Sequence, residues 1–368
     1  MSTLLHRCGL STAPHAPAGE PTRVSGQSRG RTRSFTVDLH CHALTLAAEK
    51  LVADRPQKLA EREIMPRMQG AESFDYTVNV MLKAAFPKLT DLNQRLADMD
   101  AMGVDLQVVS PAPNQYYYWA DPELARDLCR SINEHLASLV AQHPDRLLAL
   151  GSVALQHPEL CIQQLDHAVK TLGLRGVEVS SQVNGLELAD PKFERFWARA
   201  EELGCVVFLH PLGTTLGERV NRHYLSNTVG QPLETTVALS YLIFGGTFDR
   251  HPGLKLVAAH GGGYLGSYIG RSDHAWHARP DARGCQRPPS EYLHQILFDT
   301  IVYRPEQLRH LIAEAGISQI VLGTDYPYDM AHYDIQALLN GIPELSAADR
   351  ASILGGNAAR ILGLKEPA

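Results

Sequence analysis

Two histidines separated by one residue are the first candidates for chemistry in this chain. His40 and His42 follow Phe35–Leu39, a short and largely apolar run that is typical of a buried strand. Side chains two residues apart on an extended chain point the same way, so both imidazoles would face one point beyond the strand end. This placement suits two ligands of one metal ion. Two solvated polar residues after a strand would give the same pattern.

Three later residues also follow strand-like runs and could bind a metal or carry a proton. His210, His260 and Asp325 each follow a short apolar run. If these runs are parallel strands of one closed sheet, their carboxyl ends open on the same face and the side chains converge there. A single histidine at a strand end is more often an ordinary hydrogen-bonded residue, but five such residues are hard to assign to chance.

The elements that would position these residues alternate along the chain. Eight runs are typical of strands: Phe35–Leu39, Leu106–Ser110, Leu147–Val153, Gly176–Val179, Val206–Leu209, Leu256–Ala259, Ile296–Phe298 and Ile320–Leu322. Helical patterns cover Asp91–Met102, Pro122–Gln142, Pro158–Leu172, Pro191–Leu203, Pro232–Phe248, Pro305–Ala315 and Ser346–Leu354. This alternation predicts an α/β fold, the (β/α)₈ TIM barrel. An open, doubly wound sheet is the alternative, but no GxGxxG follows the first strand.

Two connections are unusually long. The segment from Ala43 to Thr90 far exceeds a typical βα loop, so we expect a long insertion after strand 1. It is either a surface addition or a lid over the barrel mouth. A second excursion, Gly213–Gly230, follows the fifth strand.

The length and composition of the chain bear on its division into domains. The chain has 368 residues, a length that suits one large α/β barrel as well as two smaller domains, and a net charge of −6. The alternation of strands and helices favours one barrel domain over residues 35–368. Residues 1–34 contain many Arg, Ser, Pro and Gly, with Glu20 as the acidic residue, and predict a disordered arm. A transit peptide would look similar, although the prolines interrupt an amphipathic helix.

The same composition bears on location. Because basic blocks are missing, nucleic acid is not an expected partner. No apolar run reaches membrane-spanning length, so no membrane association is expected. Six scattered cysteines without a CxxC pair fit a reducing compartment, which predicts a cytoplasmic protein.

Four motifs carry a family resemblance. They are Asp38-Leu39-His40-Cys41-His42, His210-Pro211, His260-Gly261-Gly262-Gly263 and Gly323-Thr324-Asp325-Tyr326-Pro327. In this order they resemble the amidohydrolase superfamily, within it the branch around aminocarboxymuconate semialdehyde decarboxylase. The likeness runs from about Val37 to Leu364 and implies the same closed barrel.

The resemblance also implies a metal centre. One divalent ion would be held by four ligands: His40, His42, His210 and Asp325. Three imidazoles and a carboxylate suit Zn²⁺, with Mn²⁺ or Co²⁺ able to substitute. His260 matches the family's catalytic acid or base. Asp325 is expected to take part in catalysis as well as in metal binding. Binuclear members carry a bridging lysine on the fourth strand, where this chain has Glu178, so one metal is expected.

Substrate contacts are implied as well. Arg271 matches an arginine that grips a substrate carboxylate from the neighbouring subunit, which implies a homodimer or higher homo-oligomer. The helix that would carry it has apolar surface that packs either on its own barrel or on that partner. Lys83 stands roughly where the muconate enzymes have an arginine, and Leu212 replaces their tryptophan. These departures point to a small phenolic or heteroaromatic carboxylic acid, with His223 as a replacement polar contact or an ordinary surface residue.

The expected activity is therefore a non-oxidative decarboxylation of an unsaturated or aromatic carboxylic acid. Loss of CO₂ leaves an electron pair on carbon, which a Lewis acid can stabilise and a histidine can protonate. A metal-dependent hydrolase or hydratase is the alternative on the same site, and a non-catalytic metal-dependent binder is the third possibility.

Overall fold

The computed structural model describes residues 34–364. The arm expected over residues 1–34 lies outside this range except for Ser34, so its disorder stays a prediction. In the described part of the chain, no helix is both long and apolar enough to cross a bilayer.

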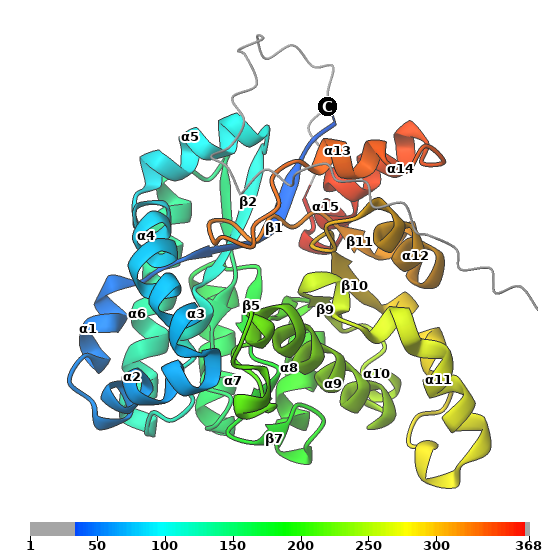
Figure 1. Ribbon diagram of the computed structural model, residues 1–368, viewed down its shortest axis with the longest axis horizontal. Coiled ribbons are helices and arrows are strands. Elements are labelled where there is room, and N and C mark those ends of the chain that lie inside the picture. Colours follow the sequence, from blue (N-terminus) through cyan, green and yellow to red (C-terminus); the bar gives the residue numbers. More distant parts are fainter. Residues whose placement is uncertain (1–33, 365–368) are drawn as a thin grey trace, which may run out of the picture.

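Parallel strands form the centre of the molecule (Figure 1). In chain order they are β1 (Val37–Ala43), β2 (Leu106–Pro111), β3 (Leu147–Ala149), β4 (Gly151–Ser152), β5 (Gly176–Val179), β8 (Val206–Leu209), β9 (Lys255–Ala258), β10 (Ile296–Asp299) and β11 (Ile320–Val321). The first three pair in the order β1-β2-β3, and the others in the order β4-β5-β8-β9-β10-β11. A small antiparallel hairpin, β6 (Gln182–Val183) with β7 (Leu186–Glu187), lies outside them.

Backbone hydrogen bonds close this sheet into a barrel. Leu39 N donates to Leu322 O at 2.9 Å, and His42 N donates to Tyr326 O at 2.8 Å, so β1 pairs with the segment that contains β11. On the other side, β3 and β4 are one strand interrupted at Leu150, whose N–H donates to Val109 O of β2. The predicted (β/α)₈ barrel is confirmed.

Helices surround the strands (Figure 1). They are α1 (Leu46–Val52), α2 (Pro56–Gln69), α3 (Ala71–Tyr76), α4 (Leu82–Thr90), α5 (Leu92–Met102), α6 (Pro122–Gln142), α7 (Pro158–Asp166), α8 (Glu194–Leu203), α9 (Gln231–Phe244), α10 (Thr247–Arg250), α11 (Leu265–Ala278), α12 (Pro305–Ala315), α13 (Ile335–Asn340), α14 (Ala347–Ala351) and α15 (Asn357–Leu362). The expected helix Pro232–Phe248 is broken in two because Gly246 adopts a left-handed φ of +70°.

The first strand is longer than its hydrophobic pattern predicts. It was expected to end at Leu39, but β1 continues through His40 and His42 to Ala43. The extension pairs with β2, with His42 opposite Ser110. Ligand candidates that were expected beyond the strand therefore lie within it, where the backbone is held on both sides.

The long insertion after β1 is helical and comprises α1 to α4. It packs against the second excursion, because Asn221 Nδ2 donates to Arg67 O at 3.1 Å. Gly70 allows this close approach: a Cβ at that position would lie 1.8 Å from Asn221 O. The two long connections thus meet beside the carboxyl ends of the strands.

Candidate metal centre

The barrel brings the four predicted ligands together in its interior. Two come from β1, His210 follows β8 directly, and Asp325 lies just beyond β11. One ligand atom from each of His40, His42, His210 and Asp325 can be chosen so that all lie within 4.8 Å of one another. All four residues are buried.

Hydrogen bonds orient the two imidazoles of β1. His40 Nδ1 donates to Asp299 Oδ2 at 2.6 Å, and His42 Nδ1 donates to the carbonyl oxygen of Pro111 at 2.9 Å. Both Nε2 atoms therefore face the centre, 3.2 Å apart. A second-layer partner of this kind fixes the ring and its tautomer for metal ligation.

Asp325 is held facing these rings. Its backbone N–H donates to His40 O at 2.8 Å, and it takes a left-handed φ of +57°. Its Oδ1 lies 3.3 Å from His40 Nε2 and 3.6 Å from His42 Nε2. Burial opposes ionisation, but the neighbouring His40, His260 and His42 hold the pKa of Asp325 well below its usual range. The centre therefore contains a carboxylate anion.

His210 shows that this donor set fits a cation. The residue is only 6% exposed, yet neither ring nitrogen has a hydrogen-bond partner among the described residues. Burial and the neighbouring His42 and His260 hold its pKa well below the usual range, so the ring is neutral and offers a lone pair. A buried polar group without a partner is costly, and a metal ion beside three imidazoles and a carboxylate would satisfy it.

His260 lies at the edge of this cluster rather than within it. Its Nε2 is 3.8 Å from Asp325 Oδ2, and its ring centroid is 5.0 Å from that of His210. The side chain is 16% exposed, whereas that of His40 is fully buried. His260 takes a left-handed φ of +56° two residues after β9 ends. This position gives the imidazole access to both the cluster and a substrate.

A carboxylate that the sequence reasoning missed connects the cluster to His260. Asp299, the last residue of β10, receives the His40 ring N–H and the backbone N–H groups of His260 and Gly261 at 2.9 and 2.8 Å. Burial raises and these hydrogen bonds lower its pKa, and the net shift is downward. Its sequence signal was an acidic residue directly after the apolar run Ile296–Phe298.

Asp299→Asn should loosen the centre without removing a ligand. An amide has one acceptor oxygen, so it cannot serve His40 and both backbone N–H groups as the carboxylate does. We expect metal affinity to fall by about 10–100-fold, as is usual for second-layer partners of ligating histidines. Titration against a chelator measures this. Asp166→Asn, which alters an ion pair with Arg199 far from the centre, is the control; equal affinities in wild type and Asp299→Asn would contradict the role.

Known proteins agree with this architecture. A family model described as amidohydrolase matches residues 37–364. The chain belongs to the amidohydrolase family. A curated relative of this amidohydrolase, 2-amino-3-carboxymuconate-6-semialdehyde decarboxylase from Dictyostelium discoideum, is 35% identical over 343 residues, which cover 90% of this chain and 92% of the relative.

Two solved structures extend the likeness. A 2,6-dihydroxybenzoate decarboxylase complexed with 2,6-dihydroxybenzoate superposes on the amidohydrolase with a TM-score of 0.73 at 26% identity, covering 90% of this chain and 99% of the other. The 5-carboxyvanillate decarboxylase from Sphingomonas paucimobilis gives 0.77 at 25% identity, covering 90% and 100%. All three similar proteins are decarboxylases, and the family resemblance expected from the sequence is confirmed.

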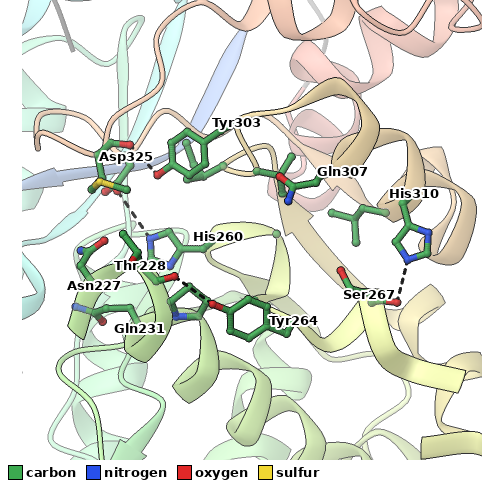
Figure 2. Close-up of a pocket in the computed structure, with 18 residues that line it drawn as sticks. Asn227, Thr228, Gln231, His260, Tyr264, Ser267, Tyr303, Gln307, His310 and Asp325 are labelled. Carbon is green, nitrogen blue, oxygen red and sulfur yellow. Dashed lines mark hydrogen bonds and ion pairs between the residues drawn. The ribbon is translucent and has the colours of Figure 1, made fainter. Parts of the chain in front are cut away.

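The amidohydrolase has a cavity of about 340 Å³ beside the cluster. Figure 2 shows His260 and Asp325 at one end and Ser267 and His310 at the other. The lining also contains amides, hydroxyls and apolar groups, including Asn227, Thr228, Gln231, Tyr303, Gln307 and Met330. No lysine or arginine of the described chain lines this cavity.

The three predicted substrate-binding residues do not reach this cavity within one amidohydrolase chain. Lys83 is exposed on α4, where its Nζ donates to Asn79 at 3.2 Å. His223 is exposed on the second excursion. Arg271 is exposed on α11 and lines a separate shallow pocket, which shares Ser267 with the cavity. Their roles stay predictions.

Proposed function

We propose that this amidohydrolase is a metal-dependent decarboxylase that releases CO₂ without oxidation from an unsaturated or aromatic carboxylic acid. The observation that carries the proposal is the buried cluster of three histidines and Asp325, with His260 beside it at the end of a cavity. Similarity to decarboxylases along nearly the whole chain supports the reaction class.

One divalent ion is proposed for the cluster, with four protein ligands: His40, His42, His210 and Asp325. The orphaned ring nitrogens of His210 support it. Three nitrogens and one oxygen suit Zn²⁺ best, and Mn²⁺ or Co²⁺ also accept this set. When bound, the ion supplies Lewis-acid stabilisation of the negative charge that develops as CO₂ leaves.

His260 is proposed to handle the proton. Cleavage of the bond between the ring carbon and the carboxylate leaves its electron pair on that carbon, and one proton must replace the departing CO₂. The imidazole of His260 delivers that proton from the cavity side, with Asp325 Oδ2 3.8 Å from its Nε2 to orient it. A histidine suits the task because it exchanges protons near neutral pH.

The cavity lining supports a phenolic or heteroaromatic monocarboxylate as substrate. Neutral amides and hydroxyls can bind ring substituents, whereas a second carboxylate would find no cation among the described residues that line the cavity. Lys83 and His223 remain proposed outer contacts, reached only if the helical insertion or the excursion moves inward.

The decisive experiment measures CO₂ release from a panel of carboxylic acids by the purified, metal-loaded protein. The panel includes 2,6-dihydroxybenzoate, 5-carboxyvanillate and matched esters and amides. We expect CO₂ from at least one acid and none from the same protein after metal removal. Turnover of the esters or amides without CO₂ release would instead establish the hydrolase alternative.

We further propose that the active assembly is a homodimer in which Arg271 serves the partner's cavity. Arg271 is exposed, and Tyr268, one helical turn earlier, is 70% exposed, so this face of α11 lacks a covering element among the described residues. Its shallow pocket adjoins the cavity through Ser267. A bidentate guanidinium from a second copy would supply the carboxylate contact that one chain lacks.

Mixing two impaired variants, assayed at a substrate concentration below the wild-type KM, tests the shared site. Arg271→Ala should raise KM at least about tenfold, since one charged hydrogen-bonded contact is lost. A 1:1 mixture with His260→Ala should recover about a quarter of wild-type activity, because half of the dimers then own one intact site. Arg279→Ala, on the exposed end of the same region, is the control. No recovery after proven subunit exchange would contradict a shared site.

A cytoplasmic location is also proposed. Its support is the state of five cysteines, which are buried and form no disulfide within residues 34–364: Cys41, Cys129, Cys161, Cys205 and Cys285. Such thiols fit a reducing compartment.

A further inference from the structure

A second buried carboxylate lies in the barrel interior beside the cluster. Glu178 belongs to β5 and is 1% exposed. Burial raises its pKa. The acid is not one of the four proposed ligands, and the decarboxylation steps above do not use it. A buried carboxyl group is costly to retain unless its hydrogen bonds organise something else.

One phenol connects Glu178 to the backbone of a proposed ligand. The Tyr116 hydroxyl oxygen lies 2.7 Å from Glu178 Oε1 and 2.9 Å from the carbonyl oxygen of His210. Tyr116 follows β2, so this single hydroxyl bridges the carboxyl ends of β5 and β8. His210 has no side-chain hydrogen bond among the described residues, so its position depends on backbone contacts: this one and the bond from its own N–H to Val179 O at 2.9 Å.

The other oxygen of Glu178 faces a second proposed ligand. Oε2 makes no hydrogen bond within the described structure and lies 3.5 Å from His42 Nδ1. That nitrogen already donates to Pro111 O at 2.9 Å and lies 3.2 Å from Ser110 Oγ. The carboxyl group therefore borders the His42 ring on the side away from the nitrogen that faces the cluster.

We infer that Glu178 and Tyr116 are positioning residues of the metal centre, acting through His42 and His210. The pair sets the distance between His42 on β1 and His210 after β8. Among the described contacts, no direct hydrogen bond joins the side chains of these two histidines. The inference rests on the proposed metal centre, because only a bound ion requires that distance. Partners that orient ligands govern affinity even though they do not touch the ion.

Removal of the phenol hydroxyl is the sharpest test. The full-length chain, stripped of metal, is titrated with Mn²⁺ against a chelator. Tyr116→Phe should weaken binding by about 10–100-fold. Tyr118→Phe is the matched control. Its ring stacks on Tyr116 with centroids 5.5 Å apart, and its hydroxyl is also buried but receives only the Ser180 N–H within the described chain. Binding by this control should stay within about twofold of wild type.

A pair of Glu178 variants tests the position of the carboxyl group itself. Glu178→Gln keeps an acceptor for the Tyr116 hydroxyl and should bind within about threefold of wild type, whereas Glu178→Leu should lose about 10–100-fold. Substitution with Co²⁺ gives a second readout, since its visible absorption reports ligand geometry. We expect altered bands for Tyr116→Phe and Glu178→Leu and unaltered bands for Glu178→Gln.

The outcomes separate this inference from the proposed function. If the wild type binds the ion tightly and Tyr116→Phe binds it equally well, only the positioning role is overturned. The same holds if Tyr116→Phe and Tyr118→Phe lose equal metal affinity. Equal losses in Glu178→Gln and Glu178→Leu would do the same. A wild-type chain that binds no divalent ion would overturn both, and absence of CO₂ release with normal metal binding would overturn only the decarboxylase.

Discussion

Replacement of His40 and His42 by alanine should empty the metal centre and stop CO₂ release. Both rings present Nε2 to the cluster from the first strand, so the double variant removes half of the proposed ligands. Loss of the Lewis acid removes several kcal/mol of charge stabilisation, which corresponds to about 10³-fold or more in rate.

Elemental analysis should find one ion per wild-type chain and almost none in this variant. The control carries His167→Ala and His277→Ala, two exposed histidines outside the cluster, and should keep its metal and its activity. Two tightly held ions per wild-type chain, or full occupancy in the His40/His42 variant, would exclude the proposed ligand set.

Metal uptake should also depend on pH. Burial lowers the pKa of His40, but Asp325 and Asp299 outweigh it and raise the value to about 10 in the metal-free protein. Its Nε2 therefore carries a proton at neutral pH, and an ion must displace that proton to bind. Affinity should weaken as the pH falls, and uptake in a weakly buffered solution should acidify it.

The second large effect concerns His260. His260→Asn should keep the metal, because this residue lies outside the four-ligand cluster. Turnover should fall by about 10²–10⁴-fold, since an amide cannot give and regain the proton that replaces CO₂. The measurement pairs steady-state kcat with metal content, and His277→Asn is the control.

Other results for His260→Asn would assign His260 a different role. Loss of metal from His260→Asn would make it a ligand, and an unchanged kcat would remove it from proton transfer. The Asp299→Asn variant helps to separate these cases, because Asp299 holds both the His40 ring and the His260 backbone. It should affect affinity as well as rate.

The convergence of His40, His42, His210, His260 and Asp325 could be predicted because each follows an apolar run in the chain, whereas the division into four ligands and one acid or base came from the family resemblance. Periodicity identifies such runs, and the parallel barrel sends their carboxyl ends to one face, so residues as distant as His40 and Asp325 converge. Helices that begin at proline, such as Pro122–Gln142 and Pro305–Ala315, were also predicted with their full bounds.

What the sequence did not reveal depends on contacts made only after folding. The length of β1 is set by its pairing with β2 and with Tyr326, which no local propensity encodes. Glu178 lies inside a strand, where an isolated acid has no spacing that marks it. Asp299 follows the run Ile296–Phe298, but a single acid after a strand does not reveal which groups it will contact. Tyr116 acts through one hydroxyl at the meeting point of three strand ends, and such a point has no sequence signature.

Closure of the barrel determines when the metal centre can form during synthesis of the chain. Thr324 N donates to Asp38 Oδ1 at 3.0 Å, a contact between residues 286 positions apart, and Asp325 N donates to His40 O. A nascent chain displays its two β1 histidines long before their carboxylate partner, Asp325, leaves the ribosome. Contacts of such long range form late and at high entropic cost. The proposed ligand set is therefore complete only after Asp325 has been synthesised, so products truncated before that residue cannot assemble it.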